Sequence, residues 1–184
     1  MLLANHPLPG KTIPSDTASR LSIRAAEDVA RFSLRIDPAS AGAAGAAFGA
    51  PLPTRIGGMV EAGGRTALQL GPDEWVLTAP VAEGDGIADA FAALPEPHSL
   101  VDVGHREVGI LVQGEAAALA LRSAIAFDVE AMPVGSGCRT LFDRAQIVLV
   151  REDEHRFRIE VWRSFADHVW GLLHAVSREI ALGI

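Results

Sequence analysis

The two halves of this sequence show the same order of predicted elements, and this internal repeat constrains the fold more than any other feature. In the first half FSLRIDPASAGAAGAAFGAPLP is followed by EWVLTAP and IADAFAAL; in the second half VGILVQGEAAALALRSAIAFDVEAMP is followed by RFRIEVWRSFADHVWGLL. Each half reads as strand, helix, strand, strand, helix. Such a unit has one apolar helix face, so each half needs its twin to cover the sheet. We predict an α+β fold of two pseudo-symmetric β-α-β-β-α repeats, forming a single domain over residues 21–184.

The first twenty residues differ from the rest, because they are rich in proline and polar residues. We predict an extended N-terminal arm over residues 1–20, with no helix or strand of its own.

Alternation of apolar and polar residues predicts a strand over Ala30–Asp37 and a second strand in which Trp75, Leu77 and Ala79 share a face. The other elements expected in the first half are a weak Ala-rich helix after Pro38, a loop over 51–66, a strand before the turn Gly71-Pro72-Asp73, and a short helix over 85–95.

The second half is predicted to contain two strands on either side of Gly104-His105, a helix over 115–126, one strand over 138–152 and one over 155–162, with an acidic turn between the last two. The last helix is expected to begin at Ser164, whose side chain can cap it, with Asp167 three residues on. Phe165 and Trp170 fall on or beside its apolar stripe, so we interpret both as core residues.

Composition excludes several classes of protein. The net charge is −7 and Lys11 is the one lysine, so a basic groove for nucleic acid is not expected. The single cysteine, Cys138, cannot form an internal disulfide. No apolar run is long enough to cross a membrane and no signal peptide is evident, so we expect a cytoplasmic protein.

The residues that carry chemistry in enzymes do not form a recognisable pattern here. No two of the six histidines have the i, i+4 spacing of a helical metal site, so no metal ligands are assigned. Asp102, His105 and Ser136 lack the strand–turn–helix elbow of a hydrolase, and Cys138 is interpreted as an unreactive, semi-buried thiol. The sequence thus predicts no catalytic, cofactor-binding or metal-binding residue on this chain.

One strand does suggest a contact surface. Arg156, Arg158 and Trp162 share a strand face opposite Phe157, Ile159 and Val161. A solvated outer face is one interpretation, because half-exposed strands often carry charges. The other is a docking face for a partner protein, since Trp and Arg are enriched at interfaces. The position of Trp162 on the polar face favours docking for that residue.

Four segments carry a resemblance to a known family. GPDEWVLTAP, VDVGHREVGI, MPVGSGCRTLFDRAQIVLVR and FRIEVWRSFADHVWGLL resemble the gamma subunit of heterotetrameric sarcosine oxidase, and the likeness extends from about Leu21 to Leu173. More distantly, the second half is similar to the start of the glycine-cleavage aminomethyltransferase. The resemblance implies the fold of that enzyme's folate-binding domain. It also implies a hetero-oligomer that oxidises sarcosine to glycine and hydrogen peroxide and passes the one-carbon unit to tetrahydrofolate.

In that family the large alpha and beta subunits hold FAD, FMN, NAD and the folate site, and a small delta subunit is a further partner. The gamma subunit is then expected to be non-catalytic and to support assembly in sarcosine catabolism. A stand-alone folate-binding or one-carbon transfer protein is the alternative, and an interaction module for another flavoprotein is a third. In the aminomethyltransferases an Asp pair follows the Thr-Leu pair and a Gly-Gly turn, whereas here Thr140-Leu141 is followed by FDRAQIVLV. This difference disfavours one-carbon transfer, although not weak folate binding.

Overall fold

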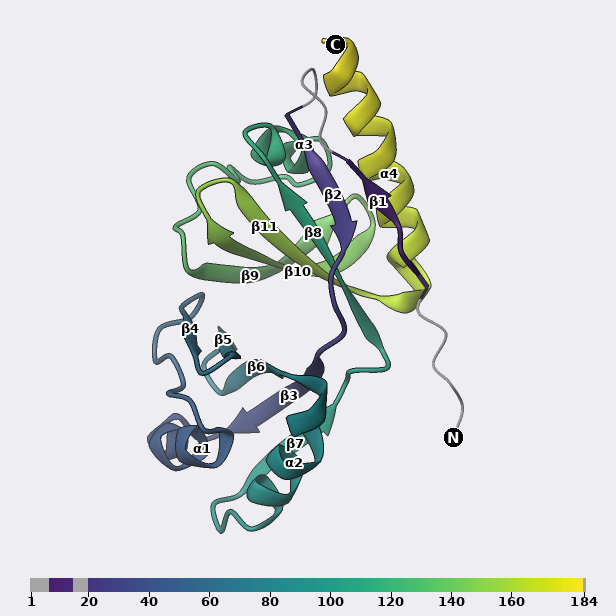
Figure 1. Ribbon diagram of the computed structural model, residues 1–184. Coiled ribbons are helices and arrows are strands. Elements are labelled where there is room, and N and C mark those ends of the chain that lie inside the picture. The colour runs from purple at the N-terminus through teal and green to yellow at the C-terminus, as the bar shows by residue number, and fades with distance from the viewer. Residues whose placement is uncertain (1–6, 15–19, 184) are drawn as a thin grey trace. The chain divides into compact units, whose positions relative to one another are not determined.

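The computed structural model describes residues 7–14 and 20–183. Its internal contacts divide it into two compact units. The five-stranded unit consists of Asp28–His105 and Gly135–Gly137, and the six-stranded unit of the described residues within Met1–Glu27, Arg106–Val134 and Cys138–Ile184. Each unit has its own sheet, as Figure 1 shows, and its own apolar core.

The five-stranded unit has an antiparallel sheet with the order β4-β5-β6-β3-β7. Its elements are β3 (Ala30–Ile36), the 3-10 turn η1 (Pro38–Ser40), α1 (Ala41–Phe48), β4 (Met59–Ala62), β5 (Arg65–Gly71), β6 (Glu74–Ala79), the 3-10 turn η2 (Val81–Glu83), α2 (Gly84–Ala92) and β7 (His98–Asp102). The predicted face of β6 is confirmed, because Trp75, Leu77 and Ala79 are all buried in the core.

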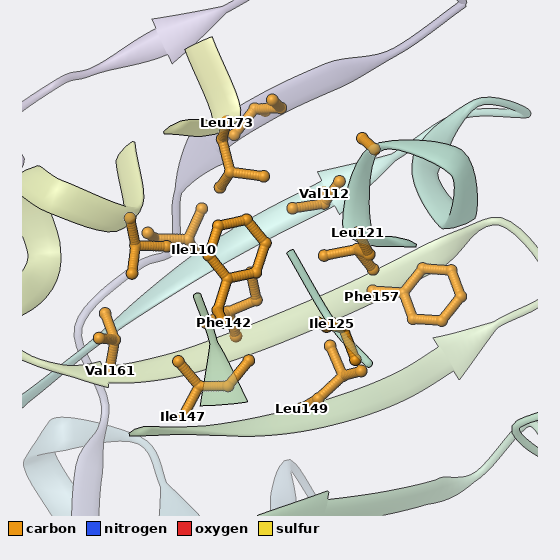
Figure 2. Packing of buried hydrophobic residues seen from close by; sticks show 14 of the residues in the cluster. Ile110, Val112, Leu121, Ile125, Phe142, Ile147, Leu149, Phe157, Val161 and Leu173 are labelled. Atoms are coloured by element: carbon orange, nitrogen blue, oxygen red, sulfur yellow. The ribbon is translucent and has the colours of Figure 1, made fainter. Parts of the chain in front are cut away.

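The six-stranded unit has an antiparallel sheet with the order β1-β2-β8-β11-β10-β9. Its elements are β1 (Thr12–Ile13), β2 (Ser22–Ala25), β8 (Glu107–Gln113), α3 (Ala117–Arg122), β9 (Ser136–Phe142), β10 (Ala145–Asp153), β11 (Arg156–Trp162) and α4 (Arg163–Leu182). Side chains from one face of the sheet, from α3 and from α4 meet in its core, with Phe142 at the centre of the labelled group in Figure 2.

The predicted repeat is confirmed in the order of the elements. The run β3-α1-β4-β5-β6-α2 in the first half matches β8-α3-β9-β10-β11-α4 in the second. The two sheets also agree in strand order, since β4-β5-β6-β3-β7 corresponds to β9-β10-β11-β8-β2. Each repeat holds one more strand after its first helix than the sequence pattern predicts.

The strand that precedes each of these runs, β2 in the first half and β7 in the second, belongs to the sheet of the other half. β2 comes directly before β3 in the chain, yet it pairs with β8 in the six-stranded sheet. β7 comes directly before β8, yet it pairs with β3 in the five-stranded sheet. The two repeats have therefore exchanged equivalent strands.

The segment 51–66, predicted as a loop, contains strand β4 and a hairpin instead. Gly63 and Gly64 lie between β4 and β5 with φ of 60° and 77°. A two-residue hairpin turn of type I′ needs positive φ at both positions, which glycine adopts without steric cost. The Gly-Gly pair is the signal from which this hairpin could have been predicted.

The segment 138–152 forms two strands rather than one, because the chain turns at Asp143-Arg144 between β9 and β10. Asp143 has a φ of 53°, a left-handed conformation that aspartate tolerates better than most residues. Its N–H donates to the carbonyl of Ala124 at 2.8 Å and its carboxylate lies 2.8 Å from Nε2 of His168. Asp143 is thus a turn residue, and these tertiary contacts stabilise the turn where glycine is absent.

The prediction that the N-terminal arm has no strand was wrong. Thr12 and Ile13 form β1 and pair with Arg24 and Ile23 of β2, while Leu8 is fully buried in the core. A two-residue strand has no periodicity of its own, so only pairing with β2 establishes it. Residues 1–6 and 15–19 of the arm lie outside the described residues.

The last helix begins at Arg163, one residue before the predicted start, and the N-cap is Trp162. Trp162 has extended backbone angles and makes no side-chain cap. The N–H of Arg163 donates to the carbonyl of Arg106 at 2.9 Å, so a backbone group satisfies one of the N–H groups of the first turn. None of the helices in the described part of the chain combines the length and the apolar character needed to cross a bilayer.

Candidate partner-docking site

Strand β11 carries the three residues that the sequence assigns to docking. It lies between β8 and β10 in the six-stranded sheet, so both of its edges are paired. One face, formed by Phe157, Ile159 and Val161, is fully buried in the core. The opposite face carries Arg156, Arg158, Glu160 and Trp162, as strand alternation predicts.

The three predicted docking residues differ in how accessible they are. Trp162 is 42% exposed, and the side chain of Arg156 is 47% exposed. The side chain of Arg158 is only 19% exposed, and its Nε donates to Oε1 of the buried Glu160 at 2.5 Å. The exposed positions are thus the two ends of β11, roughly 20 Å apart at about 3.3 Å per residue.

The Arg158–Glu160 pair is held inside the protein. Burial acts to lower the pKa of Arg158, but the charge of Glu160 and its hydrogen bond, with a smaller effect of Glu152, outweigh burial and raise that pKa. The guanidinium therefore stays charged and bound to its own strand. The main role of Arg158 is therefore to hold Glu160 in place, and its charge is less available to a partner protein.

At the other end of β11, Arg156 is paired on the surface. Its Nε lies 2.7 Å from a carboxylate oxygen of Glu152 on β10, whose side chain is 23% exposed. An ion pair at this exposure is screened by water and contributes little to stability. Arg156 can therefore exchange Glu152 for a carboxylate of another protein at small cost.

The exposed indole of Trp162 lies against a second cation that sequence reasoning missed. The guanidinium carbon of Arg106 lies 5.3 Å from the centroid of the Trp162 ring, and Nη2 of Arg106 is 2.9 Å from Oε1 of Glu107. The backbone carbonyl of Arg106 also accepts the N–H of Arg163. Because the pairing of Trp162 with Glu107 brings Arg106 alongside, this contact follows from the β8–β11 register, which the sequence pattern does not give.

Of the other tryptophans, Trp75 is fully buried, and its Nε1 donates to the carbonyl of Pro53 at 2.9 Å. Trp170 and Phe165, predicted as core, are partly buried and pack against the core from its margin. Nζ of Lys11, from the N-terminal segment, lies 5.9 Å from the centroid of the Trp170 ring.

The remaining candidate residues have local roles in the structure. Asp102 accepts the N–H of Gly104 at 2.8 Å, which fixes the turn after β7, and Ser136 is buried at the start of β9. Cys138 is half-buried, and burial raises the pKa of its thiol. Within residues 7–14 and 20–183 no three His, Cys, Asp or Glu side chains are grouped as a metal site would require.

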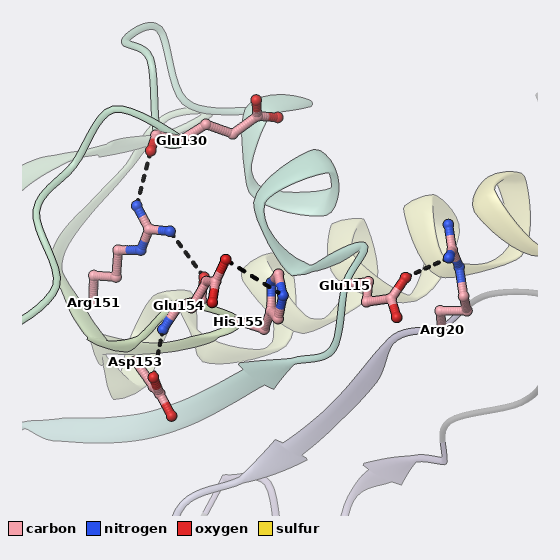
Figure 3. Close-up of polar contacts among 7 residues, drawn as sticks. All are labelled: Arg20, Glu115, Glu130, Arg151, Asp153, Glu154 and His155. Carbon is pink, nitrogen blue, oxygen red and sulfur yellow. Dashed lines mark hydrogen bonds and ion pairs between the residues drawn. The ribbon is translucent and has the colours of Figure 1, made fainter.

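A further arginine missed by the sequence analysis holds the loop after α3. Arg151 on β10 donates from Nη1 to the carbonyls of Glu130 and Met132 at 2.8 and 2.6 Å, and from Nη2 to the carbonyl of Glu154 at 2.9 Å. Figure 3 shows its guanidinium between the Glu130 loop and the β10–β11 turn. The sequence carries no signal for this role, because all three acceptors are backbone groups.

Residues 33–179 match the model of the "Sarcosine oxidase, gamma subunit family". The chain belongs to this family. The sarcosine oxidase subunit gamma of an Arthrobacter species is 32% identical over 159 residues, which cover 83% of this chain and 77% of the relative. That of Corynebacterium sp. strain P-1 is 32% identical over 171 residues, covering 88% and 82%.

Solved structures agree with this membership in the gamma subunit family. A chain of heterotetrameric sarcosine oxidase from Corynebacterium sp. U-96, solved in complex with pyrrole 2-carboxylate, matches with a TM-score of 0.81 and 28% identity, covering 90% of this chain and 88% of that one. The glycine cleavage aminomethyltransferase T from Bartonella henselae matches with a TM-score of 0.65 and 15% identity, covering 85% and 46%. The second likeness concerns the fold alone. The predicted family and the predicted α+β, aminomethyltransferase-like fold are both confirmed.

Proposed function

We propose that this chain is a non-catalytic gamma subunit that assembles with the alpha, beta and delta subunits of a sarcosine oxidase complex in the cytoplasm. The large subunits would hold FAD, FMN, NAD and tetrahydrofolate and carry out the oxidation of sarcosine. The chain itself would support assembly. Membership of the gamma subunit family and the similarity to a chain of a heterotetrameric enzyme support this proposal.

The observation that carries the docking role is the exposed stack of Trp162 and Arg106. A large aromatic side chain at 42% exposure retains much apolar surface for a partner to bury. Its contact with Arg106, itself held by Glu107, orders both side chains before binding. Ordering in advance lowers the entropic cost of association, which is typical of interface residues with a large share of the binding energy.

Arg156 extends the same surface to the far end of the strand. A contact that covers both ends of β11 would span roughly 20 Å, which fits an interface of about 800 Å² on each partner. The buried Arg158–Glu160 pair lies between them and would contribute a rigid, polar centre. We therefore assign docking chiefly to Trp162, with Arg156 at the rim and Arg158 as a positioning residue.

The test is assembly of the full chain with the large subunits. Trp162→Ala is expected to weaken the complex at least about tenfold, since an interface tryptophan typically contributes 2 kcal/mol or more. Its melting temperature should fall by only about 1–3 °C, because the stack with Arg106 contributes about 0.5–1 kcal/mol at an exposed site.

Leu119→Ala is the matched control, because Leu119 is an exposed apolar residue of the same unit that lies on α3 rather than β11. It should leave both assembly and melting temperature unchanged. The proposal fails if Trp162→Ala binds the large subunits as tightly as the unmodified chain. It fails equally if the large subunits do not bind the unmodified chain.

A further inference from the structure

Strand β7 forms one edge of the five-stranded sheet, with β3 on its inner side. The N–H of Val103 donates to the carbonyl of Arg31 at 2.8 Å, the residue that continues the β7–β3 register. Hydrogen-bonded and non-hydrogen-bonded pairs alternate along an antiparallel ladder. Val101 therefore bonds to β3, whereas Leu100 and Asp102 direct their N–H and C=O groups toward the outer edge.

Among the described residues, no strand pairs with the outer edge of β7. Within residues 7–14 and 20–183, no hydrogen bond from another segment reaches the N–H or C=O of Leu100 or Asp102. An edge of this kind is a template for a further strand.

The other repeat shows the equivalent edge already occupied. β2 corresponds to β7, and β1 pairs with the outer edge of β2, as Figure 1 shows. Ala25 is opposite Ile110 as Leu100 is opposite Leu34, and these two pairs are equivalent in the repeat. The N–H of Ala25 donates to the carbonyl of Lys11 in the arm at 3.1 Å. The N–H of Leu100 is thus equivalent to the N–H of Ala25, which donates to the added segment in the six-stranded sheet.

The added strand in the six-stranded sheet also contributes an apolar side chain. Ile13 of β1 is opposite Ile23 and packs against the core. By the same equivalence, a strand on β7 would place an apolar residue opposite His98. There it would cover the edge of the core where His98 contacts Phe91, with ring centroids 5.6 Å apart.

β7 lacks the features with which proteins usually block a free edge. It has no lysine or proline inside it, and its pairing with β3 runs without a register shift. Val101 is 51% exposed on the face opposite Leu100. Glu96 before β7 and Asp102 at its end are both negative, and apart from the histidines they are the charged residues between positions 92 and 105. A strand that binds here should therefore carry positive charge.

We propose that β7 is a strand-addition site for an extended segment of a large subunit. The segment would run antiparallel to β7, place an apolar side chain opposite His98 and carry net positive charge. This inference rests on the proposed function for its partner, but it concerns a surface separate from the face of β11 that carries Trp162.

Hydrogen–deuterium exchange of the full chain, alone and in complex with the large subunits, tests the proposal. The amides of Leu100 and Asp102 are expected to exchange at least tenfold more slowly in the complex. The amides of β4, the opposite edge of the same sheet, serve as the control and should not change. A complex that elutes as one species but leaves exchange in β7 unchanged overturns the inference while the proposed function stands. If no complex forms, both the strand-addition inference and the proposed function are refuted.

Substitutions at Val101 test the edge and its charge preference. Val101→Lys should weaken assembly at least tenfold, and Val101→Glu should weaken it less, because only the lysine repels a basic segment. Leu141→Lys, at a 54% exposed apolar position on β9, is the matched control and should have no effect. Equal losses for Val101→Lys and Leu141→Lys would overturn the proposal. So would a dimer of the isolated chain that Val101→Lys dissociates, since the occupant would then be a second copy.

Discussion

Replacing Arg151 with alanine removes the three hydrogen bonds that hold the loop after α3 to the β10–β11 turn. The guanidinium also lies 5.4 Å from the ring centroid of the buried Phe157. The bond to the carbonyl of Met132 is partly buried and charge-assisted, and such bonds contribute about 1.5–3 kcal/mol. The two exposed bonds contribute less, roughly 0.5 kcal/mol each, and the ring contact about 0.5–1 kcal/mol.

After subtraction of the side-chain entropy that Arg151 loses on folding, Arg151→Ala is expected to lower the free energy of unfolding by about 1–3 kcal/mol. In a chain of this length the melting temperature should fall by roughly 2–12 °C. Urea denaturation followed by circular dichroism gives the free energy, and a thermal scan gives the temperature. Arg151→Lys keeps the charge but can reach fewer of the three carbonyls, so it should recover only part of the loss.

Arg156→Ala is the control for the loss of an arginine from this sheet. It breaks one exposed ion pair with Glu152, so it should change stability by no more than about 1 kcal/mol. The reasoning would be refuted if Arg151→Ala destabilised the protein by less than about 0.5 kcal/mol. It would be refuted too if Arg151→Lys were as stable as the unmodified chain, because the three-way geometry would then be irrelevant.

Three further outcomes follow from the buried and titrating groups. Trp75→Phe removes the donor to Pro53 inside the core and should cost about 1–3 kcal/mol in a denaturation experiment; a neutral result would show that the carbonyl finds another donor. The hydrogen bond from His168 and that from the backbone of Arg144 lower the pKa of Asp143. Its ionised form therefore stabilises the folded state above the carboxyl's unfolded pKa, and this stabilisation is lost as pH falls through the folded pKa. Asp143→Asn should be less stable than the unmodified chain at pH 7, and in a series of thermal scans the gap should close as pH falls through the lowered pKa of the folded state. Because burial raises the pKa of Cys138, its alkylation by iodoacetamide at pH 7 should be slower than that of free cysteine and should accelerate above pH 9; rapid labelling at pH 7 would contradict this.

The sequence predicted those parts of the fold that depend on local periodicity. Alternation placed Trp75 and Phe157 on buried strand faces, and the stripe of apolar residues located the last helix. The errors occur where contacts distant in sequence decide the structure. The last helix begins at Arg163, whose N–H donates to the carbonyl of Arg106, and not at the predicted Ser164. The turn at Asp143 is held by contacts with Ala124 and His168.

In the candidate docking site, too, local periodicity predicted some features and contacts distant in sequence decided the others. Strand periodicity identified Trp162 as the residue that departs from the buried face, and its exposure agrees with that. Periodicity cannot give the neighbours of a side chain across the sheet. The stack on Arg106 requires the β8–β11 register, and the internal pairing of Arg158 requires that Glu160 be buried.

The exchange of β2 and β7 between the two sheets determines how this chain can be divided and how it folds. If the chain were cut after α2, the first piece would keep β2, which belongs to the six-stranded sheet, and would lack β7. The second piece would keep β7, which belongs to the five-stranded sheet, and would lack β2. Two copies of one repeat that swapped their first strands would show the same connectivity. Ser22 of β2 pairs with Gln113 of β8, which is synthesised much later. The six-stranded sheet can therefore form only after most of the chain has been synthesised. Such long-range closure slows folding, and it means that neither half is an independent folding unit.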